Sequence, residues 1–84
     1  MDIVISAREP RPIYEQIKDQ IENAIIGGKL AQGDQLPSIR VLANELGVSV
    51  ITTKRAYADL EAAGFITSVQ GRGCFVSAND ANAV

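Results

Sequence analysis

Apolar residues recur every fourth position in the first third of the chain, at Ile13, Ile17, Ile21 and Ile25. Charged and amide side chains fill the positions between them, which is typical of an amphipathic helix with one buried face. Pro12 suits the first helical position, where its missing N–H costs nothing, and Gly27 and Gly28 are expected to stop the helix. We interpret the isoleucine stripe as part of a hydrophobic core.

Two further segments of helical period follow, and Gly47 separates them. Ser38, after Pro37, is a natural N-cap for a short helix, and Ser49 is one for a longer helix that ends near Ala63. The expected core positions of this pair are Ile39, Leu42, Ala43 and Leu46, then Thr53, Ala56, Tyr57 and Leu60. Two helices joined by a tight turn that contains a glycine are the helix-turn-helix pattern.

After Gly64 the period changes from helical to alternating. The segment FITSVQGRGCFVS alternates apolar and polar residues around a Gly-Arg-Gly tip, which predicts a small hairpin. The fold class is therefore α+β, a winged helix-turn-helix of three helices followed by a two-stranded β-hairpin wing. The expected boundaries are an N-terminal arm or short strand over residues 1–11, the winged domain over 12–77 and a polar tail over 78–84.

Composition narrows the classes of function. A chain of 84 residues makes one small domain, too small to enclose a large substrate pocket, and no apolar run is long enough for a membrane span. No signal peptide is visible, and the lone Cys74 fits a reducing cytoplasm. The chain has no histidine, so we expect no metal site and no cofactor. Catalysis is not expected either, since Gly71-Arg72-Gly73 is too short for a phosphate-binding loop.

Net charge is the main objection to nucleic-acid binding, because acids exceed bases by ten to eight. The charges are, however, unevenly distributed along the chain. From Ser38 to Arg55 the bases are Arg40, Lys54 and Arg55, against the single acid Glu45, whereas the first helix is acidic. A locally positive face on an acidic body can still bind DNA.

The third helix has an unusual outer face. At about 100° per residue, Ile51, Arg55 and Ala58 lie opposite its core positions, with Lys54 on the flank and Val50 near the start. An exposed isoleucine beside two bases suits a face that meets thymine methyl groups and phosphates. The alternative is an ordinary solvated helix with one stray apolar residue. Within a helix-turn-helix we favour the DNA-contacting interpretation.

Two other arginines are candidates for DNA contact. Arg40 lies early in the second helix, the element that crosses the DNA backbone in this architecture, and is placed to clamp a phosphate. The alternative is a surface arginine paired with Glu45. Arg72, at the hairpin tip, can enter a narrow minor groove. The alternative is that Arg72 is a turn residue that serves only solubility. Cys74 is interpreted as a buried, inert thiol.

The run PIYEQIKDQIENAIIGGKLAQGDQLPSIRVLANELGVS, followed by TTKRAYADLEAAGFI and GRGCFV, resembles the amino-terminal domain of GntR-family transcription regulators. The resemblance covers residues 12–76, and its PIYEQI, GDQLPS and AY.DLE.AGFI segments are most similar to the YtrA-type branch. It implies a transcription regulator that binds double-stranded DNA. The positions that it implies as DNA contacts are Ser38, Arg40, Ser49, Val50, Ile51, Thr52, Lys54, Gln70, Gly71 and Arg72.

The chain departs from the family pattern in three respects. Many members have an arginine where this chain has Val50, so a strong guanine-reading contact is missing, and Cys74 replaces the usual threonine. Family members also continue into a carboxy-terminal region that binds an effector or forms the dimer, whereas this chain stops just after the wing. We expect a homodimer on a palindromic operator in the full-length protein, with an unidentified small-molecule effector and a mostly monomeric isolated chain.

Two other functions stay open at the level of sequence. A winged helix can serve protein contacts instead of DNA, and the net acidity of the chain permits that use. The domain can also be the front of a longer regulator with an aminotransferase-like domain, since the resembled family includes such chains. A positive face on the folded surface favours DNA binding over the protein-contact alternative.

Overall fold

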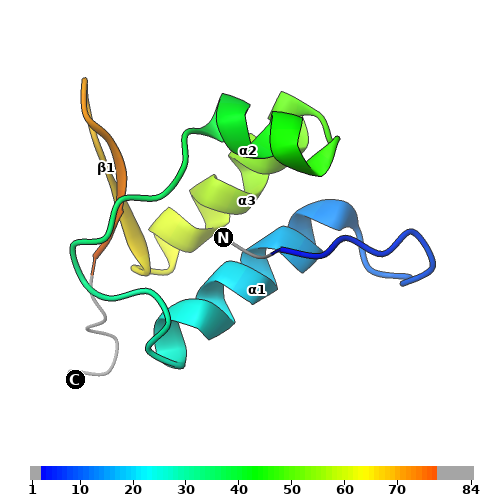
Figure 1. Ribbon diagram of the computed structural model, residues 1–84, viewed down its shortest axis with the longest axis horizontal. Helices are drawn as coiled ribbons and strands as arrows, with labels where there is room; N and C mark the ends of the chain where they lie inside the picture. Colours follow the sequence, from blue (N-terminus) through cyan, green and yellow to red (C-terminus); the bar gives the residue numbers. More distant parts are fainter. Residues whose placement is uncertain (1–2, 78–84) are drawn as a thin grey trace.

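The computed structural model describes residues 3–77 and contains three helices followed by a two-stranded antiparallel sheet (Figure 1). The elements are α1 (Ile13–Ile26), α2 (Ile39–Leu46), α3 (Val50–Ala62), β1 (Ile66–Val69) and β2 (Gly73–Val76). This order confirms the predicted winged helix-turn-helix. The predicted tail, residues 78–84, lies outside the described residues.

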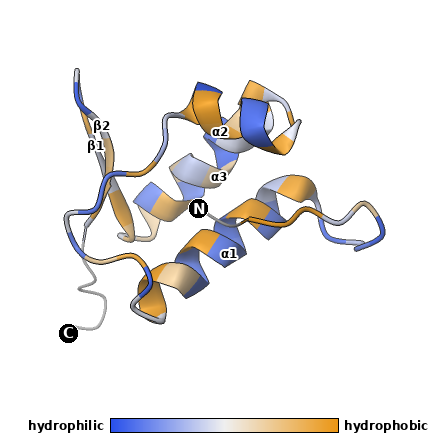
Figure 2. Ribbon diagram, viewed as in Figure 1, coloured by the Kyte–Doolittle hydropathy of each residue, from blue (hydrophilic) through white to orange (hydrophobic). Residues whose placement is uncertain are grey.

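The core lies between the three helices and the base of the hairpin. Three of the four stripe isoleucines, Ile17, Ile21 and Ile25, are buried, and polar residues occupy the outer side of α1 (Figure 2). Ile13 differs from the prediction, because it is the first helical residue and stays 38% exposed. Pro12 also lies one position earlier than predicted, as the residue that precedes the helix.

The buried face of α3 agrees with the helical period of its sequence. Thr53, Ala56, Tyr57 and Leu60 are all buried. The Tyr57 hydroxyl donates a hydrogen bond of 2.7 Å to the Pro37 carbonyl oxygen, just before α2. Burial, followed by the neighbouring Cys74 and Glu45, raises the pKa of Tyr57 well above its ordinary value. The phenol therefore stays protonated and keeps donating, which fixes α3 relative to the start of α2.

The hairpin is built into the domain through the segment before α2. Ile66 pairs with Val76 and Val69 with Gly73 in the β1–β2 register. The backbone of residues 34–36 lies along the other edge of β2, where the Leu36 N–H donates to the Cys74 carbonyl and the Val76 N–H to the Asp34 carbonyl, both at 2.8 Å. The periodicity of the sequence does not indicate this pairing. Cys74 was predicted to be buried, but it is only half-buried.

The arm ahead of α1 forms no strand within residues 3–12 and contains a turn at Ala7 and Arg8. The side-chain amide of Gln20 bonds both the N–H and the carbonyl of Val4, at 2.9 and 2.7 Å. Gln16 does the same for Ser6, at 2.9 and 3.1 Å, which explains how a glutamine can be buried in this core. No helix among residues 3–77 is long and apolar enough to cross a membrane.

Candidate nucleic-acid interface

The helix-turn-helix is fixed at both helix starts by a serine. The Ser38 hydroxyl accepts a hydrogen bond from the Val41 N–H at 3.1 Å, and the Ser49 hydroxyl accepts one from the Thr52 N–H at 2.9 Å. Between the helices Gly47 adopts φ 70°, a left-handed conformation that glycine reaches without steric cost. Local sequence therefore fixes the starts of α2 and α3 and the turn between them.

The outer face of α3 combines apolar and basic side chains. Ile51 is 79% exposed and Val50 45% exposed, and Lys54, Arg55 and Ala58 are exposed beside them. This exposed set matches the face predicted from helical angles. Exposing an isoleucine side chain to water is unfavourable. Its position at the centre of a basic helix face therefore indicates contact with another molecule.

Thr52 has a hydroxyl that is only partly used within the domain. Its oxygen accepts a hydrogen bond of 2.9 Å from the Ser49 hydroxyl, while its own O–H has no acceptor among residues 3–77. A hydroxyl can donate and accept at once. The half-buried Thr52 can therefore donate to a phosphate or a base edge without losing the bond that orders the start of α3.

Arg40 is exposed in the first turn of α2, on the same side as the start of α3. Within the described chain its guanidinium has no carboxylate partner, so the predicted alternative, a pair with Glu45, is not formed. Arg40 borders a shallow, open hollow between the two helices; its lining also includes Val41, Ala43, Asn44, Val48 and Val50. Arg40 and Val50 thus lie on one continuous surface.

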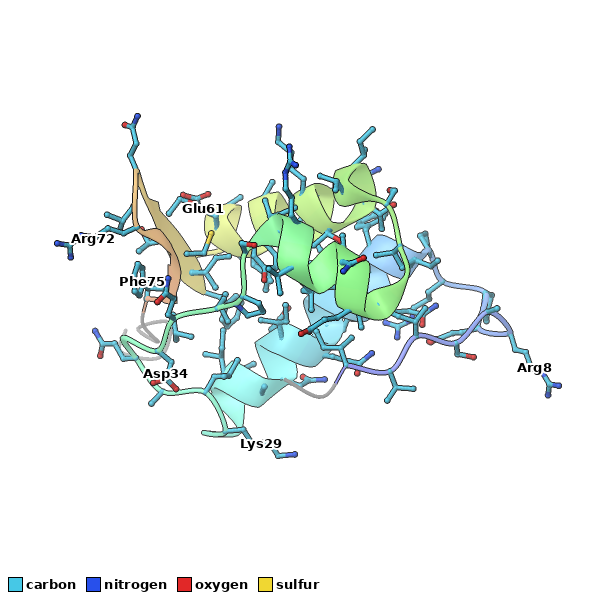
Figure 3. All side chains as sticks on the ribbon, turned by 45° about the horizontal axis from the view of Figure 1, so that its top comes forward. Arg8, Lys29, Asp34, Glu61, Arg72 and Phe75 are labelled. Atoms are coloured by element: carbon cyan, nitrogen blue, oxygen red, sulfur yellow. The ribbon has the colours of Figure 1, made fainter. Side chains whose placement is uncertain are left out.

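The wing presents its tip to solvent. Val69 accepts a hydrogen bond of 2.9 Å from the Arg72 N–H, which closes a turn with Gln70 and Gly71 at its centre. Gly71 has φ 81°, as the third position of a type II turn requires. All three tip residues are exposed, and Figure 3 shows Arg72 projecting away from the helices.

Comparison with known proteins identifies the family. Residues 13–76 match the family described as bacterial regulatory proteins of the gntR family. The chain belongs to the GntR family. It is 40% identical over 77 residues to the transcriptional repressor YtrA of Bacillus subtilis, covering 92% of this chain and 59% of the repressor. It is 33% identical to the regulator Rv1152 of Mycobacterium tuberculosis, covering 90% of this chain and 63% of that regulator.

Solved structures of similar proteins share this fold. YtrA from Sulfolobus acidocaldarius, a GntR-family transcription factor, superposes with a TM-score of 0.85 at 45% identity, over 96% of this chain and 86% of that one. The DNA-binding domain of AraR, solved in complex with operator ORX1, superposes with a TM-score of 0.80 at 32% identity, over 92% and 99% of the two chains. The predicted resemblance to the GntR family and to its YtrA-type members is thereby confirmed.

Arg55 has a partner within this GntR-family domain that the sequence analysis missed. Its guanidinium carbon lies 4.0 Å from the centre of the Tyr14 ring, so α3 and α1 are joined by a cation–π contact. Stacking uses the flat face of the guanidinium and leaves its N–H edge free to donate. The periodicity of α1 could not reveal this role of Tyr14, because a pattern within one helix does not show contacts with another helix.

Replacing Tyr14 by leucine is expected to weaken the packing of α1 on α3. An exposed cation–π contact contributes about 0.5–1 kcal/mol, so the free energy of unfolding should fall by at least that amount. Tyr14→Phe keeps the ring and should lose much less. The measurement is urea unfolding of both variants, alone and combined with Arg55→Ala. Equal losses for Tyr14→Leu with and without Arg55 would contradict the contact.

Two bases of the arm and α1 are paired with acids, whereas the predicted DNA-contacting bases are not, in the part of the chain that the structure describes. On α1 and the arm, Arg11 pairs with Glu9 and Asp19, and Lys18 pairs with Asp19 and Glu22 at 3.4 Å. The predicted DNA-contacting cations are exposed and, in residues 3–77, have no salt bridge: Arg40, Lys54, Arg55 and Arg72. The helix-turn-helix and the wing thus carry positive charge that the acids of α1 do not neutralise.

Proposed function

We propose that this GntR-family domain binds double-stranded DNA in a sequence-specific manner, with α3 in the major groove and the wing tip in the adjacent minor groove. The observation that carries the proposal is the outer face of α3, where Ile51 is 79% exposed beside Lys54 and Arg55, neither of which forms a salt bridge within residues 3–77. The AraR complexes with operators support it, because they contain a DNA-binding domain of the same fold at 32% identity.

Each side chain of the interface has a role that follows from its chemistry. Arg40, Lys54 and Arg55 contact phosphates, and the start of α3 reads base edges through Ile51 and the free Thr52 hydroxyl. The remaining contacts come from Ser38, Ser49, Val50, Gln70, Gly71 and Arg72. Val50 offers only apolar contact, so this domain reads a thymine methyl where an arginine would read guanine.

The domain acts as part of a larger regulator. It spans 59% and 63% of the lengths of the first two curated relatives, both of which are transcriptional regulators. We therefore propose a homodimeric protein on a palindromic operator, whose region after residue 77 binds an effector or forms the dimer. Such a regulator works in the cytoplasm, where the lone Cys74 stays reduced.

The test separates anchoring from reading. Arg40→Ala and Lys54→Ala are expected to weaken binding to all duplexes alike, since a phosphate contact carries no base information. Ile51→Ala should change the preferred base, at a cost of about 1–3 kcal/mol if a base edge is contacted. Affinities are measured by fluorescence anisotropy on a selected operator half-site and on random DNA.

Lys29→Ala is the matched control, because Lys29 is an exposed basic residue in the turn after α1, away from the wing (Figure 3). It should leave both affinities unchanged. If all three interface variants lose the same amount on specific and random DNA, then this face does not read sequence. If none loses affinity, the domain serves protein contacts.

A further inference from the structure

Gln35 links two parts of the domain that lie far apart in the sequence. Its side-chain Nε2 donates a hydrogen bond of 2.8 Å to the backbone carbonyl of Arg72, at the wing tip. No other side-chain hydrogen bond reaches residues 70–73 in the described part of the chain. The tip is otherwise held only by its own turn and by the last pair of the β1–β2 ladder.

The backbone on both sides holds Gln35 in place. The backbone of Gln35 forms a bridge with Phe75 at the edge of β2. Backbone hydrogen bonds on either side of it, from Leu36 to Cys74 and from Val76 to Asp34, fix the position of Gln35 along that strand. Because this segment is anchored beside the middle of β2, the side chain of Gln35 reaches past the end of the strand toward the tip.

Gly73 permits this approach. A Cβ atom at residue 73 would lie 3.0 Å from the Gln35 Nε2, and Gly73 has φ 114°, which side-chain-bearing residues rarely adopt. On the opposite side of the hairpin, Glu61 accepts bonds from the Ser68 N–H at 3.4 Å and hydroxyl at 3.3 Å. Glu61 therefore steadies the middle of β1, whereas Gln35 makes the only side-chain hydrogen bond to the tip within residues 3–77.

We propose that Gln35 is a positioning residue for the wing, which holds the backbone of Arg72 in its binding position before DNA arrives. A hairpin tip that moves freely loses conformational freedom when it enters a groove, and this loss opposes binding. A tip that is already ordered avoids it. The inference rests on the proposed contact between Arg72 and the minor groove.

The first measurement concerns the free protein. Gln35→Leu removes the donor at similar size, and Gln35→Glu removes it at constant length. In both, the ¹⁵N order parameters of residues 71–73 should fall from about 0.85 to below about 0.6, while those of α3 stay unchanged. The matched control is Gln32→Leu, a substitution at an exposed glutamine of the same loop.

The second measurement concerns DNA. On a half-site with an A·T-rich flank, Gln35→Leu is expected to weaken binding about five- to tenfold, the loss that one net hydrogen bond of about 1 kcal/mol represents. In an Arg72→Ala background the same substitution should have no further effect, because the side chain that Gln35 positions is absent. Gln32→Leu should bind like the unaltered domain.

The outcomes separate this inference from the proposed function. Unchanged order parameters at the tip in Gln35→Leu and Gln35→Glu overturn the holding role of Gln35. A mobile tip with unchanged affinity overturns the positioning role, while a loss in Arg72→Ala still supports the wing contact. No loss in Arg72→Ala refutes the wing contact itself, and with it the positioning role for DNA.

Discussion

Raising the salt concentration from about 50 to about 200 mM is expected to weaken binding of the isolated domain to its half-site about a hundredfold. Each phosphate that a cation neutralises contributes a slope of about −0.9 to the logarithm of affinity against the logarithm of salt. Four exposed cations without salt bridges in residues 3–77, namely Arg40, Lys54, Arg55 and Arg72, give a slope of about −3.6.

The slope also tests each cation separately. Alanine at any one of the four positions should flatten the slope by about 0.9, whereas Lys29→Ala should leave it unchanged. Arg55 is the most informative position, because it reaches phosphate only through the edge that its stack on Tyr14 leaves free. The measurement is a titration series over salt for each variant. Affinity that does not respond to salt would rule out the DNA interface.

Joining two of these domains is expected to raise affinity for a two-half-site operator by about 10²- to 10⁴-fold over the single domain. One domain presents a single α3 and a single wing, which together cover one half of a palindromic site. Once the first domain of a linked pair has bound, the second meets its half-site at an effective concentration in the millimolar range, as expected for a short linker. No new contact is needed for this gain.

Half-site spacing should control the gain. Both copies of α3 reach the same side of the duplex only when the half-sites are separated by about one helical turn or a multiple of it. A shift assay compares the chain with its fusion to a dimeric coiled coil, on operators of varied spacing and on a scrambled second half-site as control. Tight binding by the unfused chain at every spacing would place the dimer interface within residues 1–77.

The helices and the wing could be predicted because their signals are local. The isoleucine period, the serine caps and Gly47 each act within a few residues, and the structure has α1, α2 and α3 where those signals place them. The outer face of α3 followed from the helical angle alone. Ile13 was wrongly predicted to be buried, because periodicity along a helix does not show how far the neighbouring elements cover it.

The contacts that orient the interface could not be predicted, because they join segments far apart in the sequence. Arg55 stacks on Tyr14 across two helices, and Gln35 bonds the wing tip over a separation of 37 residues. Gln16 looked like a surface residue by type, yet it is buried because it pairs with the backbone of the arm. Such contacts depend on how the elements are arranged in space, and the pattern of residues along the chain does not show that arrangement.

Charge is unevenly distributed in this domain: α1 carries three acids and one base, whereas residues 38–55 carry three bases and one acid, which gives the domain an electric dipole despite its net charge of −2. Far from DNA, the net charge repels the domain, so encounters should be slower than for a basic protein. Within a Debye length, about 8 Å at physiological salt, the duplex instead exerts a torque that turns the basic side inward. The acids of α1 thus disfavour encounters in which α1 faces the DNA. The domain is therefore oriented before it contacts any base.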